Sequence, residues 1–145
     1  RLALAFLFGG VIGWEREYED KPAGLRTFIL VSVGAALFVL TVLETVEQAQ
    51  SMTPVGPTRV DPVRIISSIA QGIGFLGAGT ILVSRGSVLG LTTAAAIWAT
   101  SAVGVASGLG LWRIALAGTV LTFIALRVLG PLTPRIVHHE DEDTS

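Results

Sequence analysis

The chain has 145 residues, of which 51% are hydrophobic and only 14% charged, and its mean hydropathy is +0.70. These values lie far from those of a typical soluble domain and indicate a membrane protein. The formal net charge of −1 argues against a nucleic-acid partner, and the lack of cysteine excludes a disulfide framework and a thiolate metal site.

Charged residues gather at a few short breaks, and in each of the five charge-free stretches between them we expect one membrane-spanning helix. A bilayer core takes about 20 helical residues, so the third and fourth stretches suffice alone and the second does once residues 24–26 join it. The fifth can extend over 112–129 if the arginines at its ends reach the head groups. The first is short, which fits either a spanning helix cut off at its start or a re-entrant segment. The stretches are 2–14, 27–43, 65–84, 86–112 and 114–126.

The sequence therefore predicts an all-α, polytopic bundle of about five transmembrane helices over residues 1–134, followed by a polar, acidic, disordered tail over 135–145. Residues 15–21 would form a short charged hairpin and residues 44–61 a longer surface loop. Asp61 and Pro62 are a start signal for the third helix, as N-cap and first helical residue.

Orientation follows from counting Lys and Arg near the helix ends. Six of these residues fall on the side of the 15–21 hairpin and the C-terminal tail, against four on the other side. The count favours an N-terminus outside and a C-terminus in the cytoplasm. Because an apolar run begins directly after Arg1, we expect the natural N-terminus to lie further upstream.

Glycines recur at helical spacing. The segment from Gly72 to Gly79 contains G-x-G-x-x-G, but a dinucleotide site also needs a preceding strand and an acidic residue about 20 positions later, and neither is present. We therefore interpret these glycines as helix-packing positions, because small residues let helices approach closely in a bilayer. A cation site formed by unwound carbonyls is the minor alternative. The packing positions are Gly72, Gly74, Gly77, Gly79, Gly104 and Gly108.

Charged residues meet where the first predicted helix leaves the membrane and the second enters. Glu15, Arg16 and Glu17 stand at the first point and Arg26 at the second. Interfacial anchoring is the simpler interpretation. The sharper one is a buried charged network of Glu15, Arg16 and Arg26, since a desolvated charge needs a partner. Glu15 and Glu17 are also the candidates for a Mg²⁺ site, because carboxylate oxygens suit that ion.

Polar side chains within the predicted helices are few. Gln71, Thr92 and Thr93 must hydrogen-bond within their own helix or to a neighbour. Trp14 and Trp112 fall near membrane interfaces, whereas Trp98 lies deeper and is expected to pack inside. The sequence offers no nucleophile with a histidine base, no paired intramembrane carboxylates and no P-loop. We therefore expect neither an enzyme nor a bound cofactor, with Mg²⁺ as the open exception.

Four segments together resemble the MgtC/SapB family of bacterial inner-membrane proteins, from about residue 2 to residue 130. The glycine segment and the GLTTAA run are specific in combination. The resemblance implies a small multi-pass protein of the inner membrane, associated with adaptation to low magnesium and, in pathogens, with virulence. The segments are Gly13-x-Glu15-Arg16, Ala23-Gly24-Leu25-Arg26-Thr27, Gly72 to Gly79 and Gly90-Leu91-Thr92-Thr93-Ala94-Ala95.

The resemblance also implies a way of working. Some members of the family act as regulators by binding membrane partners, including the F-type ATP synthase, and longer members add a cytoplasmic C-terminal domain. The family's glutamine is expected about one turn before the glycine segment, where this chain has Ser68, with Gln71 beside Gly72. That departure puts any role of the amide in doubt.

The sequence and the family resemblance are compatible with three functions. The leading hypothesis is a non-enzymatic regulator of magnesium homeostasis and stress adaptation that binds partners in the lipid bilayer. The alternatives are a small transporter of Mg²⁺ or another solute and a structural assembly factor. A transporter needs a polar path near mid-membrane, whereas the deep polar groups here are an amide and hydroxyls. The Gly and Ala faces are also compatible with a homodimer, although periodicity does not say which helix would make the contact.

Overall fold

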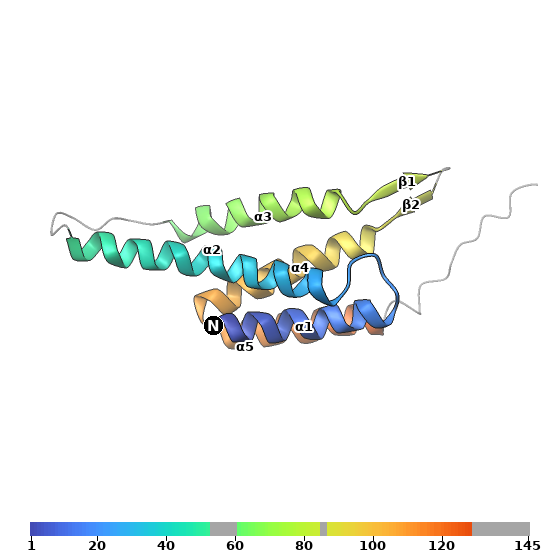
Figure 1. Cartoon of the computed structure of the whole chain (residues 1–145), viewed down its shortest axis with the longest axis horizontal. Helices are drawn as coiled ribbons and strands as arrows, with labels where there is room; N and C mark the ends of the chain where they lie inside the picture. Colours follow the sequence, from blue (N-terminus) through green and yellow to red (C-terminus); the bar gives the residue numbers. More distant parts are fainter. Residues whose placement is uncertain (53–60, 85–86, 129–145) are drawn as a thin grey trace, which may run out of the picture.

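The computed structural model describes residues 1–52, 61–84 and 87–128, which form five α-helices and one two-stranded hairpin (Figure 1). The prediction of an all-α architecture with five helices is confirmed for these residues, and the hairpin was not expected. The predicted tail, 135–145, lies outside the described residues. The elements are α1 (Leu2–Tyr18), α2 (Leu25–Met52), α3 (Pro62–Ala78), β1 (Leu82–Ser84), β2 (Ser87–Leu89), α4 (Leu91–Leu109) and α5 (Trp112–Arg127).

Two of these helices are long and apolar enough to cross a membrane. Residues Leu25–Ser51 have a mean hydropathy of 2.3 and Leu91–Leu109 one of 1.2. The apolar part of α3, Val63–Ala78, is shorter. Length and composition thus identify α2 and α4 as membrane-spanning candidates by themselves.

The prediction of a single helix over residues 65–84 is wrong. The helix ends at Ala78, where the Thr80 hydroxyl donates to the Gly77 carbonyl at 2.8 Å, and an antiparallel hairpin follows. Gly90 then adopts a φ of 88°, which favours glycine and turns the chain into α4. For this reason α4 begins at Leu91 and not at residue 86.

Two charged segments that were expected as loops are helical. The first helix continues through residues 15–18, and α2 extends to Met52, well into the loop predicted over 44–61. Glutamate, glutamine and alanine are good helix formers, and no proline occurs between Leu25 and Met52, so the helix continues to Met52. The predicted start of α3 is confirmed: the Asp61 side chain accepts a hydrogen bond from the Val63 N–H at 2.9 Å, with Pro62 at the first helical position.

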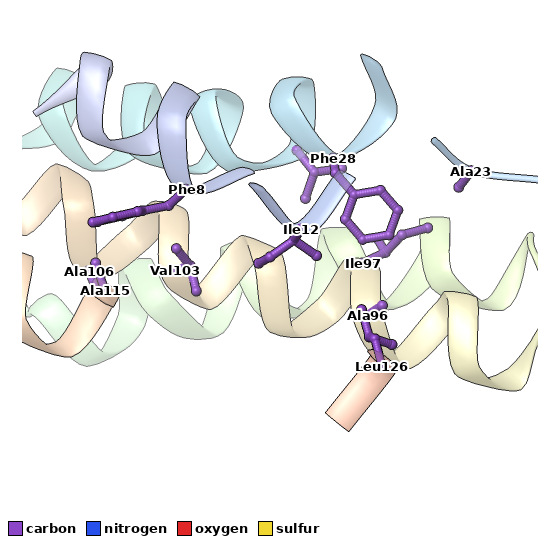
Figure 2. Packing of buried hydrophobic residues seen from close by; sticks show 11 residues of the cluster. Phe8, Ile12, Ala23, Phe28, Ala96, Ile97, Val103, Ala106, Ala115 and Leu126 are labelled. Carbon is purple, nitrogen blue, oxygen red and sulfur yellow. The ribbon is translucent and has the colours of Figure 1, made fainter. Parts of the chain in front are cut away.

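The helices run side by side along one long axis (Figure 1). Helix α2 packs against both α1 and α4, α5 packs against α4 and α1, and α3 lies at the edge against α4. A cluster of apolar side chains lies between α1, α2 and α4 (Figure 2). It includes Phe8 and Ile12 from α1, Phe28 from α2, and Ile97 and Val103 from α4. Between apolar helices in lipid, such close packing supplies much of the stabilisation.

Candidate functional site

A buried ion pair lies in the last turns of α1. The Arg16 guanidinium donates through Nε to Glu15 Oε2 at 2.6 Å and through Nη2 to Glu15 Oε1 at 3.0 Å. The two residues are only 3% and 4% exposed. Taking two charges out of water costs several kcal/mol per ion, and a two-pronged geometry of this kind is what offsets such a cost. Each of these two charges is therefore neutralised by the other.

The next carboxylate along α1 caps α2. Glu17 Oε2 accepts a hydrogen bond from the Leu25 N–H, the first amide of α2, at 2.9 Å. A negative charge is favourable there because helix N-termini carry unpaired N–H groups and a partial positive charge. A side chain on Gly24 would collide with the same carboxylate, so the glycine makes room for this cap.

Arg26 stands apart from these contacts. Its side chain is exposed, and the ion pairs formed among residues 1–52, 61–84 and 87–128 join Arg16 to Glu15 and Arg127 to Glu19. Of the three residues of the predicted network, the structure thus brings two together. The link between α1 and the start of α2 is made by Glu17 instead, which sequence reasoning did not anticipate. Gly24 directly before a helix start is the signal that could have indicated it.

The two carboxylates named as Mg²⁺ candidates both have protein partners. Glu15 is bonded to Arg16, and Glu17 is bonded to the Leu25 amide. Within the described part of the chain, no group of three or more His, Cys, Asp or Glu side chains is placed to hold a metal ion. These contacts neutralise a buried charge in α1 and connect the end of α1 to the start of α2, which is a structural role.

The predicted packing glycines divide into two groups. Gly104 and Gly108 lie against α2: a Cβ at Gly104 would stand 2.9 Å from the Cα of Ser32, and one at Gly108 would stand 3.0 Å from the Cα of Ala36. From α1, a Cβ at Gly9 would come within 2.7 Å of Ser32 Cβ. Helices α1 and α4, which also contact each other, therefore both approach α2 at Ser32, at distances that only glycine allows.

The glycines of the 72–79 segment are in looser surroundings. A Cβ at Gly77 would make an ordinary contact with the Ala94 carbonyl at 3.5 Å, and one at Gly79 would approach a carbonyl at the end of its own helix, that of Leu76, at 3.3 Å. Gly72 and Gly74 are exposed and have open space around the Cβ position within the described residues. These two do not serve packing inside the monomer.

The three polar residues that were predicted inside the membrane differ in their exposure. Thr93 is buried, whereas Thr92 and Gln71 are exposed. Trp98 was expected to pack inside, and that prediction is wrong, because it is 54% exposed. Its neighbour Ile97 takes the inward position of this helical turn, and Trp98 is turned to the outside.

Several buried hydroxyls are bonded within their own helices, whereas Ser32 Oγ of α2 is buried and has no hydrogen-bond partner among the described residues. Thr100 donates to the Ala96 carbonyl and Ser107 to the Val103 carbonyl, each at 2.8 Å. Thr119 of α5 likewise donates to a carbonyl four residues earlier. These three hydroxyls are thus used within single helices.

Comparisons with known proteins agree with the motif analysis. Residues 2–135 match the MgtC family. The chain is 41% identical over 138 residues to a protein of Escherichia coli strain K12 named "Putative magnesium transporter YhiD", and 44% identical over 131 residues to "Protein MgtC" of Brucella abortus strain 2308. It is 43% identical over 134 residues to "Protein SrpB" of Synechococcus elongatus.

These alignments cover nearly all of this chain and a part of each relative. They include 95% of this chain and 63% of the YhiD protein, 90% and 50% for the Brucella protein, and 87% and 71% for SrpB. The chain thus spans half to about two thirds of the length of the first two relatives. No solved structure matches it.

Proposed function

Because the chain belongs to the MgtC family, we propose that it is a non-enzymatic membrane protein of magnesium homeostasis that works by binding other proteins in the bilayer. Adaptation to low magnesium is the process in which it would act. The F-type ATP synthase is the first partner to test, carried over from the family resemblance. Family membership with these relatives and the close approach of α1 and α4 to α2 at Ser32 are the two supports of this proposal.

In this proposal all five helices cross the membrane, with the N-terminus outside. The turn between α1 and α2, the β-hairpin and the end of α5 all lie at one end of the bundle (Figure 1). That end carries Arg16, Lys21, Arg26 and Arg127 among the described residues. An excess of Lys and Arg favours the cytoplasmic side.

Thiol labelling tests this orientation, because the chain has no cysteine of its own. A single cysteine at Asp20, in the α1–α2 turn, should be protected from a membrane-impermeant maleimide added to intact cells. A cysteine at Ser51, near the far end of α2, should react. The reverse pattern would contradict the orientation, and labelling of both would contradict the spanning arrangement.

The close crossing at Ser32 is the observation that carries the mode of action. Gly9 of α1 and Gly104 of α4 both approach α2 at that residue, whose own hydroxyl is buried without a hydrogen-bond partner among the described residues. A solute path would need polar groups turned toward a shared space near the middle of the bundle. The close crossing at Ser32 favours a scaffold that presents its outer surface to partner proteins.

A transporter of Mg²⁺ is the second candidate, and the name of the E. coli relative favours it. In that case the crossing would have to open during transport, which the contacts of Gly104 with the backbone of Ser32 oppose.

Photocrosslinking in living cells tests partner binding. The chain would be expressed in a bacterium that lacks its own MgtC-family protein, with benzoylphenylalanine at Trp98, which is exposed, or at the adjacent buried Ile97. We expect restored growth at low magnesium and, from position 98 or a second exposed position at Leu121, an adduct with one discrete membrane protein. Ile97 should give none. Restored growth with no protein adduct from either exposed position would contradict the proposal.

A further inference from the structure

An apolar groove lies between α2 and α3, because these two helices hardly touch (Figure 1). Its volume is about 460 Å³, within the range of about 300–1,000 Å³ that is usual for ligand sites. Among the described residues that line it, only Ser68 has a polar side chain, and its hydroxyl already donates to the Arg64 carbonyl at 3.0 Å. A hydrocarbon occupant therefore suits this α2–α3 groove. Its lining residues are Leu30, Val31, Gly34, Ala35, Phe38, Ser68, Ile69, Gly72, Ile73 and Leu76.

Arg26 and Thr27 extend the α2 wall of the groove toward the start of the helix. They precede Leu30 and Val31 by four residues and so lie on the same face of α2. Both side chains are exposed, and Arg26 takes part in neither of the ion pairs formed among residues 1–52, 61–84 and 87–128. A cation with five N–H donors thus stands one helical turn, about 5.4 Å, beyond the apolar wall.

The charge-free part of α2 sets the depth of the groove in the five-span arrangement proposed above. Residues 27–43 lie between Arg26 and Glu44 and rise about 25 Å, close to the ~30 Å of a hydrocarbon core. Arg26 then stands at the cytoplasmic head groups. Phe38, the last residue of the groove on α2, is about 18 Å from Arg26 along the helix, roughly the depth of one leaflet. A lipid whose chain fills the groove would therefore bring its head group to Arg26.

We propose that the α2–α3 groove and Arg26 together bind an anionic phospholipid of the cytoplasmic leaflet, with an acyl chain in the groove and the phosphate at the guanidinium. Arginine binds phosphate through two parallel N–H···O bonds, and basic sites between membrane helices on the cytoplasmic side bind anionic head groups. Arg64 stands one turn before the α3 wall at the opposite end, but Glu44 and Asp61 belong to that end and oppose an anion. The inference rests on the proposed function only in that α2 and α3 cross the membrane.

Native mass spectrometry with added lipid tests the choice of head group. The full chain, delipidated in mild detergent, would be titrated with palmitoyl-oleoyl phosphatidylglycerol and, separately, with phosphatidylethanolamine of the same chains. We expect phosphatidylglycerol to bind about fivefold tighter or more, the value of one cation at a membrane surface, and Arg26→Ala to lose this preference. The matched control is Arg64→Ala, which also removes an exposed arginine and should keep it. Equal affinity for the two lipids, or equal loss in the two variants, would overturn the proposal.

Filling the groove tests the place of the acyl chain. A Cβ at Gly34 meets nothing within 4 Å, so Gly34→Leu should keep its helicity by circular dichroism while its side chain occupies the groove. Binding of phosphatidylglycerol should fall severalfold, whereas Ala117→Leu, at an exposed position of α5, should bind it as before. Undiminished binding to Gly34→Leu would contradict the groove as the place of the chain.

Photocrosslinking from inside the groove tests the occupant in native membranes. Benzoylphenylalanine in place of Phe38, which lines the groove and is 67% exposed, should give a phospholipid adduct. A protein adduct from this position would replace the lipid by that partner and overturn the proposal.

Failure of this inference is separable from failure of the proposed function. If Phe38→Cys reacts readily with a membrane-impermeant maleimide, then α2 does not lie in the bilayer at that residue and the five-span arrangement fails. If it is protected and the chain shows no preference for phosphatidylglycerol, only the lipid site is contradicted. A lipid site in a chain that leaves low-magnesium growth unrestored would contradict the function and leave the site in place.

Discussion

Replacing Gly104 with alanine tests the close crossing of α2 and α4. The added Cβ would lie 2.9 Å from both the Cα and the carbonyl carbon of Ser32, whereas two carbon atoms pack best at about 3.5–4.0 Å. Because these atoms belong to the backbone of α2, no change of rotamer can make room, and the helices must separate by about 1 Å. A gap of that size forfeits roughly a quarter to a half of the dispersion energy of each contact that it opens.

Overpacking of a close-packed interior costs about 1–3 kcal/mol, and contact with backbone places Gly104→Ala at the upper end, at about 3 kcal/mol. Gly10→Ala is the matched control, because its Cβ would make only an ordinary contact of 3.7 Å with the side chain of Ile29. Alanine is the better helix former by about 1 kcal/mol, so Gly10→Ala should be neutral or stabilising.

The free energy of unfolding of both variants would be measured in mixed micelles, by titration with SDS and circular dichroism at 222 nm. Equal stabilities for Gly104→Ala and Gly10→Ala would refute the reasoning, since the two changes are chemically identical and differ only in what the Cβ meets.

Three further substitutions test the charged end of the bundle, each by the same titration. Glu15→Gln leaves the buried Arg16 charge without its partner and should lower the free energy of unfolding by about 3–5 kcal/mol. Glu19→Gln breaks an exposed pair and should lower it by at most about 1 kcal/mol. Comparable losses from the two variants would show that burial of the first pair is unimportant. Gly24→Ala displaces the Glu17 carboxylate from the start of α2 and should lower the free energy of unfolding by about 1 kcal/mol, the usual value of a lost N-cap. An unchanged stability would contradict the cap. Arg26→Ala changes an exposed side chain and should alter stability by no more than about 0.5 kcal/mol; a larger loss would restore Arg26 to the network predicted from the sequence.

Hydropathy and helix-end signals predicted much of the fold. Charge-free stretches located five helices because a long apolar segment satisfies its own backbone hydrogen bonds when it is helical. The start of α3 was predictable because Asp61 and Pro62 act locally, within three residues of the helix they begin.

The β-hairpin and the end of α3 could not be predicted in the same way. Residues 65–84 are uniformly uncharged, so hydropathy alone cannot show that Thr80 closes the helix and that Gly90 takes a positive φ. Burial of Trp98 was wrongly expected because depth along a helix does not say which side faces the bundle.

The candidate site shows a similar limit. Glu15 and Arg16 are neighbours in sequence and the need of a buried charge for a partner was foreseeable, but the cap that Glu17 makes on α2 depends on how the turn between the helices closes. Likewise, the spacing of the glycines indicates close packing without saying that Gly104 meets α2 while Gly72 meets open space.

Mg²⁺ flux is the most direct measure of the central claim, that this bundle is a closed scaffold acting through partners. The purified protein, shown by circular dichroism to be helical after reconstitution, would be placed in liposomes that contain a Mg²⁺-sensitive dye, beside empty liposomes and liposomes with the Arg26→Ala variant. The account predicts Mg²⁺ entry no faster than into empty liposomes for both proteins. Saturable entry that is faster than into empty liposomes, with either protein, would contradict it and make the chain a transporter.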